Sequence, residues 1–361
     1  MKILYVITGL GQGGAERVVC DLADRMYESG YEVKIAYLIG NILTCPTHKE
    51  IELIKIDLNS IVALTSAYLK LSKLIKQYNP DVIHSHMVHA NILTRLIRIT
   101  TPIKKLICTA HNSDEGGRLR MALYRLTHNL ADTTTNVSNT ATKSFERKKA
   151  VPKNGMITIY NGVNLSNFKY SPSARREINL EFILNPEIKI ILAVGRFNKQ
   201  KNYPNLLNAI KILKEKNHLL PFKLLIAGDG ELRESIEILI ESLNLRNDII
   251  ILGRRSDIPN LMSACDVFVL SSDYEGLPTV LIEALACQAH IVSTDVSGAR
   301  EIVAENSGKI VQINDSYALA EAIYETMLNN TSKNILGCNI VSQKFNLDTV
   351  ADNWISIYNG K

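Results

Sequence analysis

The chain repeats one pattern twice: short runs of β-branched and aliphatic residues alternate with stretches long enough for helices. In the first half these runs are 2–7, 33–38, 81–86 and 105–110. In the second half they are 188–195, 222–230, 248–253, 266–272 and 290–296. Such runs predict buried strands, and helices between them predict parallel strands joined by crossover helices. We therefore predict an α/β fold with two doubly wound, Rossmann-like domains.

A polar tract separates the two series of predicted strands, just after the turn dipeptide Asn-Gly at 161–162. We place the N-terminal domain at 1–165 and the C-terminal domain at 166–344. A length of 361 residues suffices for two domains of about 100–200 residues each. In the last segment, 345–361, apolar and aromatic residues are spaced along one helical face, at Val350, Trp354, Ile357 and Tyr358.

The composition excludes several classes of protein. Hydrophobic residues make up 46% of the chain and charged residues 21%, which is typical of a globular protein. No apolar run approaches the roughly 20 residues that span a bilayer, and the N-terminus lacks a signal-peptide pattern. The six cysteines form no C-x-x-C pair, so a zinc site or a disulfide framework is disfavoured. We expect a cytoplasmic protein.

Charge is unevenly distributed. Residues 1–163 carry 21 Lys and Arg against 13 Asp and Glu, whereas the remainder carries 20 against 23. Two basic segments, 90–107 and 115–130, set Arg and Lys among apolar residues. Such segments can bind an anionic membrane surface, although a core-packed helix with a solvated basic edge explains the first one equally well. The residues expected at the surface are Arg118, Arg120 and Arg125.

A glycine-rich turn follows the first predicted strand, in the sequence GLGQGGAERVV (9–19). Glycines permit close approach to backbone N–H groups, and the N-terminus of the next helix favours anions. Gly13 and Gly14 are therefore placed to meet a phosphate or an acceptor group. The turn is no regular G-x-G-x-x-G, and no acid ends the second strand to hold a ribose, so a dinucleotide is disfavoured. Taken alone, such a turn is as often structural as functional.

Basic residues follow the first strand of the second half, in VGRFNKQKN (194–202). Open α/β sheets bind ligands at the carboxyl ends of their strands, so Arg196 and Lys201 stand where a diphosphate would lie. Taken alone, these residues are more often solvated loop charges.

Two glutamates flank a helix start in EGLPTVLIE (275–283). Pro278 suits the first turn of a helix and Gly276 frees the preceding loop, so Glu275 precedes the helix and Glu283 lies inside it. Carboxylates accept hydrogen bonds from sugar or ribose hydroxyls, and such charge-assisted bonds are worth about 1.5–3 kcal/mol. An isolated pair at this spacing is more often a pair of ordinary surface charges.

Histidines offer a further signal, since His111 directly follows the strand predicted at 105–110 and so stands at its carboxyl end. His84 and His86 alternate along their strand and suit either the core or the rim. No acids show D-x-D spacing and no histidines show the helical spacing of metal ligands, so we expect no metal ion.

Together and in this order, the motifs resemble the family 4 retaining glycosyltransferases of the two-domain B-type fold. They are GGAER after the first strand, TAHN, NGV at the domain junction, VGR with its Lys, AGDG with a Glu, and EGLPTVLIE followed by SGAREIV. The resemblance spans essentially the whole chain. Many relatives have two glycines where this chain has Ser297-Gly298, so the contact made by that loop is left open.

The resemblance implies a role for each side chain. Arg196 and Lys201 are similar to the pair that neutralises the donor diphosphate. Glu283 is similar to the glutamate that holds the ribose hydroxyls, and Glu275 to the one that meets the transferred sugar. His111 is similar to a residue that touches this sugar.

The resemblance also implies roles for the main chain. The N–H groups of Gly276, Leu277 and Thr279 would line the sugar and phosphate. The main chain at Arg254 and Arg255 would frame the base. Gly13 and Gly14 would approach the donor phosphate or the acceptor.

By this resemblance the protein moves a sugar from a nucleotide diphosphate, UDP in preference to others, to a lipid-linked or saccharide acceptor in surface polysaccharide assembly. The N-terminal domain would hold the acceptor, the C-terminal domain the donor in the cleft between them, and the last helix would cross back onto the N-terminal domain. No cofactor and no nucleic acid are implied, and an acceptor of this kind suits a peripheral membrane protein. Two alternatives stay open: a UDP-sugar 2-epimerase, and a carbohydrate-binding protein that has lost turnover.

Overall fold

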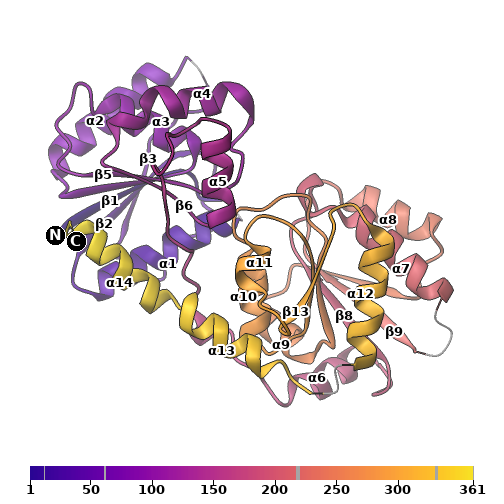
Figure 1. Ribbon diagram of the computed structural model, residues 1–361. Coiled ribbons are helices and arrows are strands. Elements are labelled where there is room, and N and C mark those ends of the chain that lie inside the picture. Colours follow the sequence, from indigo (N-terminus) through magenta and orange to yellow (C-terminus); the bar gives the residue numbers. More distant parts are fainter. Residues whose placement is uncertain (12, 61, 217–219, 330–331, 361) are drawn as a thin grey trace. The chain divides into compact units, whose positions relative to one another are not determined.

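The computed structural model describes residues 1–11, 13–60, 62–216, 220–329 and 332–360. It contains two compact units, one formed by Met1–Asn164 with Phe345–Lys361 and the other by Leu165–Lys344 (Figure 1). Each unit is an open parallel sheet with helices on both faces. The prediction of two doubly wound α/β domains is confirmed.

The first unit is built on a parallel sheet with the strand order β3-β2-β1-β4-β5-β6-β7. Its strands are β1 (Lys2–Gly9), β2 (Glu32–Ile39), β3 (Glu52–Lys55), β4 (Val82–His86), β5 (Leu106–Ala110), β6 (Thr133–Asn136) and β7 (Ile157–Thr158). Its helices are α1 (Gly14–Glu28), α2 (Leu64–Tyr78), α3 (Val88–Ile97), α4 (Gly117–Thr127), α5 (Asn139–Arg147) and α14 (Leu347–Tyr358), with a short 3-10 helix η1 (His128–Leu130).

The second unit is built on a parallel sheet with the order β10-β9-β8-β11-β12-β13. Its strands are β8 (Lys189–Val194), β9 (Phe222–Ala227), β10 (Ile249–Gly253), β11 (Val267–Leu270), β12 (Ile291–Thr294) and β13 (Gly308–Val311). Its helices are η2 (Leu165–Asn167), α6 (Ala174–Glu181), η3 (Lys199–Lys201), α7 (Tyr203–Lys216), α8 (Arg233–Ser242), α9 (Ile258–Ala264), α10 (Thr279–Ala286), α11 (Ala299–Ile302), α12 (Ser316–Asn329) and α13 (Ile335–Lys344).

Every strand run predicted from the sequence forms a strand, but the sequence analysis missed β3, β6, β7 and β13. Three of these are edge strands, β3 and β7 in the first sheet and β13 in the second. An edge strand is less enclosed than a central one and needs no continuous apolar run. The fourth, β6, has the sequence TTTN, which is β-branched but polar.

Alternate residues of β1 serve two layers of the core in the first unit. Ile3 and Tyr5 pack on the face that α1 and α14 cover, and Leu4 and Val6 pack on the face that α2 and α3 cover. Successive side chains of a strand point to opposite faces of the sheet. A strand covered on both faces must therefore be apolar throughout, which is why these strands read as continuous runs.

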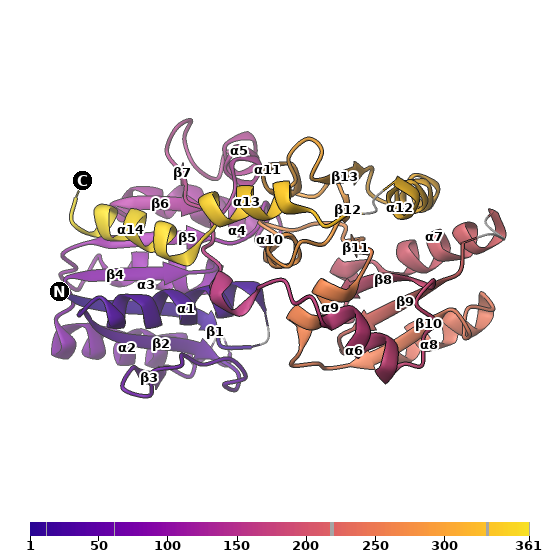
Figure 2. The ribbon, with the colours of Figure 1, turned by 90° about the horizontal axis from the view of Figure 1, so that it is seen from below.

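Helix α14 belongs to the first unit although it ends the chain, and it packs beside α1 (Figure 2). Val350, Trp354 and Tyr358 are buried in the core that includes β1, as their helical spacing predicts. The segment before the helix is fixed by two backbone hydrogen bonds, from Val163 N to the Phe345 carbonyl (2.9 Å) and from Leu347 N to the Val163 carbonyl (3.0 Å).

Each sheet has a point at which the strand order reverses. In the first sheet β1 lies between β2 and β4, and in the second β8 lies between β9 and β11. Open α/β sheets bind ligands outside the carboxyl ends of the strands at such a switch point. The loops after β8 and β11 therefore mark the candidate site of the second unit.

Among the described residues, no helix combines the length and the apolarity that a membrane span requires.

Candidate functional site

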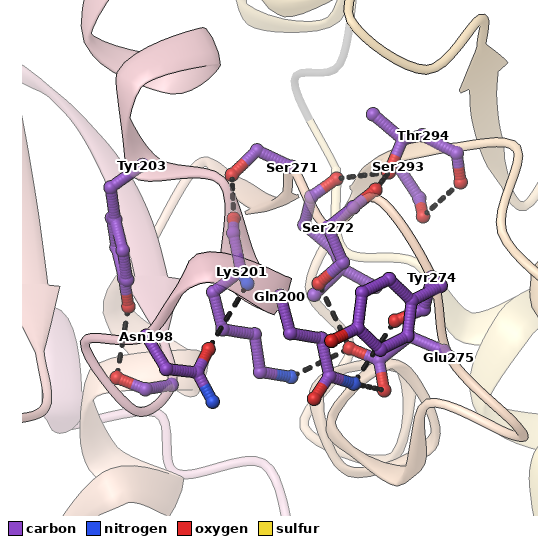
Figure 3. A network of polar contacts seen from close by, with 12 residues as sticks. Asn198, Gln200, Lys201, Tyr203, Ser271, Ser272, Tyr274, Glu275, Ser293 and Thr294 are labelled. Carbon is purple, nitrogen blue, oxygen red and sulfur yellow. Dashed lines mark hydrogen bonds and ion pairs between the residues drawn. The ribbon is translucent and has the colours of Figure 1, made fainter. Parts of the chain in front are cut away.

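Two loops meet at the carboxyl edge of the second sheet, one after β8 with Gln200 and Lys201 and one after β11 with Ser272 and Glu275 (Figure 3). They lie together because β8 and β11 are neighbouring strands. The structure thus brings Lys201 to Glu275 although the two are 74 positions apart in sequence.

The Glu275 carboxylate is the centre of a hydrogen-bonded network. Its Oε1 accepts from the Lys201 ammonium (2.8 Å) and from the Ser272 hydroxyl (2.8 Å). Its Oε2 accepts from the side-chain amide of Gln200 (3.0 Å), which also donates to the Tyr274 carbonyl (3.0 Å). Three donors from two loops therefore hold the carboxylate in one orientation.

Side chains also join the backbones of these loops. The Asn198 side chain accepts from Lys201 N (3.2 Å) and starts the 3-10 turn η3. The Ser271 hydroxyl donates to the Lys201 carbonyl (2.8 Å), and the Thr294 hydroxyl donates to the Ser272 carbonyl (2.6 Å). The site is therefore held rigidly by β8, β11 and β12.

The ion pair is largely buried, since the side chains of Lys201 and Glu275 are 17% and 10% exposed. A buried charge is stable only when it is paired and hydrogen-bonded, and both conditions are met. The arrangement offers a fixed carboxylate acceptor beside an ammonium, which suits a ligand that carries hydroxyls next to an anion.

Glycines allow the loops after β8 and β9 to approach each other. A Cβ atom on Gly195 would lie 3.2 Å from Cε of Lys201, so the lysine stem runs across this glycine. Gly228 has φ +158°, and a Cβ there would collide with the Gly195 carbonyl. At Gly230 a Cβ would lie 2.6 Å from the Phe197 carbonyl. The glycines of the AGDG motif thus have a packing role.

Arg196 stands apart from the buried pair. Its guanidinium is 58% exposed and lies 3.3 Å from the Glu231 carboxylate, which is 55% exposed. Exposed pairs of this kind contribute about 0–1 kcal/mol to stability. Arg196 can therefore exchange this partner for an anionic ligand at little cost.

Helix α10 begins at the same edge of the sheet. Pro278 is its N-cap and Thr279 its first residue, so the proline stands one position before the first turn in which the sequence analysis placed it. Glu283 lies inside the helix, as predicted, and is partly exposed.

The loop that contains Ser297-Gly298 packs against the start of EGLPTVLIE. Gly298 has φ +79°, and a Cβ there would lie 3.0 Å from the Gly276 carbonyl and 3.1 Å from Cα of Leu277. The contact made by this loop, which was left open from the sequence, is a close backbone approach that Gly298 permits.

The predicted base-binding segment follows β10. Arg254 is exposed, whereas the Arg255 side chain bonds to both carboxylate oxygens of Glu181 (2.6 and 3.0 Å) and to Asp257 (2.8 and 2.7 Å). Hydrogen bonds from Asp257 and Glu181 raise the pKa of Arg255 further above its usual value. The Arg255 side chain is thus engaged within its own unit, and the prediction concerns its main chain alone.

In the first unit, His111 lies at the carboxyl end of β5 and is 7% exposed. Its Nε2 is 3.0 Å from Nδ1 of His86, and its buried Nδ1 has no hydrogen-bond partner among the described residues. Burial lowers the pKa of His111 to about 4, so the imidazole is neutral at pH 7.

Of the two positions left open for the histidines of β4, the structure selects the core. His84 and His86 are 0% and 1% exposed, and Nδ1 of His84 lies 2.8 Å from the Tyr358 hydroxyl of α14. Burial lowers the pKa of both histidines well below the usual value.

The glycine-rich turn lies at the carboxyl end of β1. Gly13 is the N-cap of α1, and Gly13 and Gly14 are both exposed. The Glu16 carboxylate lies over the turn, close enough to collide with any Cβ on Gly13. Gln12, within the same motif, lies outside the described residues.

No cluster of three or more His, Cys, Asp or Glu in the described part of the chain has a geometry suited to a metal ion.

The sequence analysis missed the residues that orient its candidates. Gln200 lies next to Lys201 within VGRFNKQKN, and Ser272 lies three residues before Glu275, so nearness in sequence was the available signal. For Glu115, near His111, the sequence signal was weaker, because the burial of an acid in a polar loop cannot be predicted until the fold is known.

Family models match both halves of the chain. The model of glycosyltransferase family 4 matches residues 12–167, and the model of glycosyl transferases group 1 matches residues 175–340.

Individual proteins are similar over most of their length. An α-1,4-N-acetyl-D-galactosaminyltransferase from Campylobacter jejuni, whose name gives an undecaprenol diphosphate-linked saccharide as acceptor, is 27% identical over 99% of this chain and 98% of its own. A UDP-Gal:α-D-GlcNAc-diphosphoundecaprenol α-1,3-galactosyltransferase from Escherichia coli is 28% identical over 82% of this chain and 81% of its own. HepE of Anabaena, solved with UDP and glucose, superposes with a TM-score of 0.85 at 19% identity, covering 100% of both chains.

Proposed function

Because the chain belongs to the glycosyltransferases, with a family 4 domain at 12–167 and a group 1 domain at 175–340, we propose that it transfers a sugar from a UDP-sugar to a lipid-linked saccharide. The names of the Campylobacter and Escherichia relatives support an undecaprenol diphosphate carrier. The UDP bound to the HepE fold supports the nucleotide.

The observation that carries the proposal is the buried pair of Lys201 and Glu275 at the switch point of the second sheet. Breaking the bond between C1 of the sugar and the diphosphate oxygen adds negative charge to the departing diphosphate. Lys201 and Arg196 stabilise this charge, and preorganised stabilisation of developing charge is commonly the largest catalytic effect. Glu275 accepts a hydrogen bond from a hydroxyl of the transferred sugar, and Glu283 accepts from the ribose.

The further assignments follow the resemblance and belong to the proposal. The acceptor hydroxyl attacks C1 from the face that the diphosphate leaves, its proton passes to a diphosphate oxygen, and the configuration at C1 is retained. The cations of the protein take the place of a metal ion. His111 contacts the transferred sugar, and backbone groups of Gly276, Leu277 and Thr279 line the donor.

A transfer assay tests the proposal. Purified protein is incubated with radiolabelled UDP-sugars, with and without a bacterial lipid extract that contains undecaprenol diphosphate saccharides. Label in the lipid phase supports glycosyl transfer. An epimerised UDP-sugar without lipid labelling would identify a 2-epimerase, and UDP-sugar binding without either product would identify a binding protein.

We further propose that α4 rests on the anionic inner surface of the cell membrane. Its face opposite the core exposes Leu119 (74%), Leu123 and Leu126 (79%), with Arg118 and Arg125 exposed among them. A short amphipathic helix of this kind can lie in a headgroup layer, where each Arg contributes about 1 kcal/mol.

The structure corrects two parts of the original membrane hypothesis. Arg95, in the first basic segment, is completely buried, because the helical part of that segment belongs to the core-packed helix α3. Arg120 donates to the Glu115 carbonyl (3.1 Å) and is only partly exposed. The surface proposed for the membrane is therefore α4 without Arg120.

Vesicle co-sedimentation tests this surface. The wild type should bind phosphatidylglycerol vesicles and lose binding in about 1 M salt, where the Debye length is about 3 Å. Arg118→Glu with Arg125→Glu should abolish binding, whereas the same charge change at Arg147 and Lys149, exposed at the end of α5 and just after it, should not. If the wild-type protein does not co-sediment with these vesicles at low salt, the membrane contact is excluded.

A further inference from the structure

A buried carboxylate lies beside His111, in the loop between β5 and α4. Glu115 is 8% exposed, and each of its carboxylate oxygens accepts a hydrogen bond. Oε1 accepts from the backbone N–H of His111 (2.8 Å), and Oε2 accepts from the Tyr124 hydroxyl (2.6 Å). The glutamate thus fixes the backbone of the residue at the carboxyl end of the strand.

Tyr124 connects this carboxylate to the sheet. Its hydroxyl accepts from the Asn91 side-chain amide (2.8 Å), which also donates to the Thr109 carbonyl of β5 (2.9 Å). The Asn91 side-chain oxygen accepts from the Ser85 hydroxyl of β4 (2.7 Å). Every member of this network is buried. A buried and fully bonded network holds its members in a single arrangement.

The loop from β5 to α4 is fixed at further points. The Asn112 carbonyl accepts from the Asn136 side chain (3.2 Å), and the Ser113 carbonyl accepts from the Ser144 hydroxyl (2.9 Å). Side chains of β6 and α5 thus hold the chain that passes over the carboxyl end of β5. The loop is preorganised, as a binding segment must be to hold a side chain in a productive geometry.

His111 is consequently held at two of its polar atoms. Glu115 bonds its backbone N–H, and His86 lies 3.0 Å from its Nε2. Within the part of the chain that the structure describes, the buried ring atom Nδ1 has no partner. A neutral imidazole has one N–H donor and one N acceptor. Because Nε2 is already engaged by His86 and Nδ1 is buried, the placement of the whole ring depends on the backbone that Glu115 holds.

We propose that Glu115 is a positioning residue for His111, and that it acts through its hydrogen bond to the His111 backbone and through Tyr124. The inference rests on the proposed function, because that function gives His111 a sugar to contact. Glu115 touches no substrate itself. Its effect on transfer arises from the placement of His111.

The opposite end of β5 provides a matched control. Asp132 accepts from the backbone N–H of Leu106 (2.7 Å), the first residue of β5, and is paired with Arg98. Both carboxylates therefore anchor an end of the same strand by a backbone N–H. Only Glu115 does so beside His111, so Asp132→Asn measures the effect on transfer of weakening such an anchor away from His111.

The test compares Glu115→Gln, Glu115→Leu and Asp132→Asn in the full chain. We expect transfer to fall about 10-fold in Glu115→Gln, in which one oxygen acceptor is lost, and about 100-fold in Glu115→Leu, in which both are lost. The fall should lie in kcat with UDP affinity unchanged, because UDP is held by the second unit. Asp132→Asn should stay within about twofold of the wild type. Equal losses in Glu115→Gln and Asp132→Asn would overturn the proposal.

A second measurement separates this inference from the proposed function. The imidazole resonances of His111, identified by their loss in His111→Gln, should shift in both Glu115 variants and stay in place in Asp132→Asn. This result would support the positioning role even if the wild type transferred no sugar. Resonances that do not move in Glu115→Leu, or that move equally in Asp132→Asn, would exclude it. Circular dichroism confirms that each variant is folded.

Discussion

Two glutamates, one in each unit, stand beyond the carboxyl ends of strands, and each residue as a whole is 8% exposed. Glu275 of the second unit is bonded by the ammonium of Lys201, whereas Glu115 of the first unit is bonded by two neutral donors, the His111 N–H and the Tyr124 hydroxyl. Burial raises the pKa of Glu115 to about 7, with these bonds and the charges of Arg95 and Arg120 opposing the shift.

The difference shows what each kind of partner provides. A cation in contact compensates the charge of a buried carboxylate, and it creates a site in which opposite charges can be redistributed when an anionic ligand arrives. Neutral donors orient a carboxylate without compensating its charge. The first arrangement suits the binding of a charged donor, and the second suits the placement of a neighbouring group.

The largest effect is expected from removal of the ammonium. Lys201→Met leaves Glu275 buried without its cation, and breaking a buried pair costs about 3–5 kcal/mol. Transfer should fall about 10³-fold, the upper range for loss of one preorganised group at a developing charge. Denaturant unfolding and turnover measure the two effects. The double variant Lys201→Met with Glu275→Gln should recover stability but not transfer; unchanged turnover in Lys201→Met would refute the role of the pair.

Arg196→Ala should lower transfer without lowering stability, whereas Lys201→Met should lower both. Its pair with Glu231 is exposed, so Arg196→Ala should change the free energy of unfolding by less than about 1 kcal/mol. Transfer should nevertheless fall about 10²-fold, because a cation for the diphosphate is lost. Lys199→Ala, an exposed charge in the same loop, is the matched control and should retain turnover. Equal activity of both variants would place Arg196 outside the site.

Glu115 should make stability depend on pH near neutrality. The unfolded chain releases this proton near pH 4.5 and the folded chain near pH 7, so the folded state binds more protons in this interval. Stability should therefore fall as pH rises from 5 to 8, by about 3 kcal/mol from this group. Glu115→Gln should flatten the dependence in thermal denaturation, and Asp132→Asn should not. Wild-type and Glu115→Gln curves with the same slope across this interval would contradict the assignment.

The smallest effect concerns the two ends of EGLPTVLIE. Glu283→Gln should weaken binding of UDP by about 10-fold, or about 1.4 kcal/mol, because the proposed role of Glu283 is to bond the ribose. Glu275→Gln should leave UDP binding within about twofold and weaken binding of the UDP-sugar instead. Isothermal titration calorimetry with UDP and with the UDP-sugar measures both. Equal loss of UDP affinity in the two variants would contradict separate roles for Glu275 and Glu283.

Much of the fold was predictable because burial on both faces of a parallel sheet leaves a trace in the sequence, a continuous apolar run for each strand. The runs at 2–7 and 188–195 are examples, and β1 shows the reason in the two core layers that its alternate residues serve. The strand β6 was missed because its threonines are β-branched but polar, so it lacks that trace.

The candidate site was predictable only as positions along the chain. Lys201 and Glu275 were identified by their motifs, but nothing in either motif says that the two side chains form an ion pair. Glu115 was not identified at all, because its burial depends on Tyr124 and on the position of α4 over β5.

The sequence by itself determined two parallel α/β units and the family of the chain. The alternation of apolar runs with helical stretches and the order of the motifs are both properties of the linear chain. Only the tertiary structure decided which carboxylate meets an ammonium and which meets neutral donors. Strand order decides this outcome: β11 lies beside β8, so their loops share one edge of the sheet and bring charges 74 residues apart to within 2.8 Å.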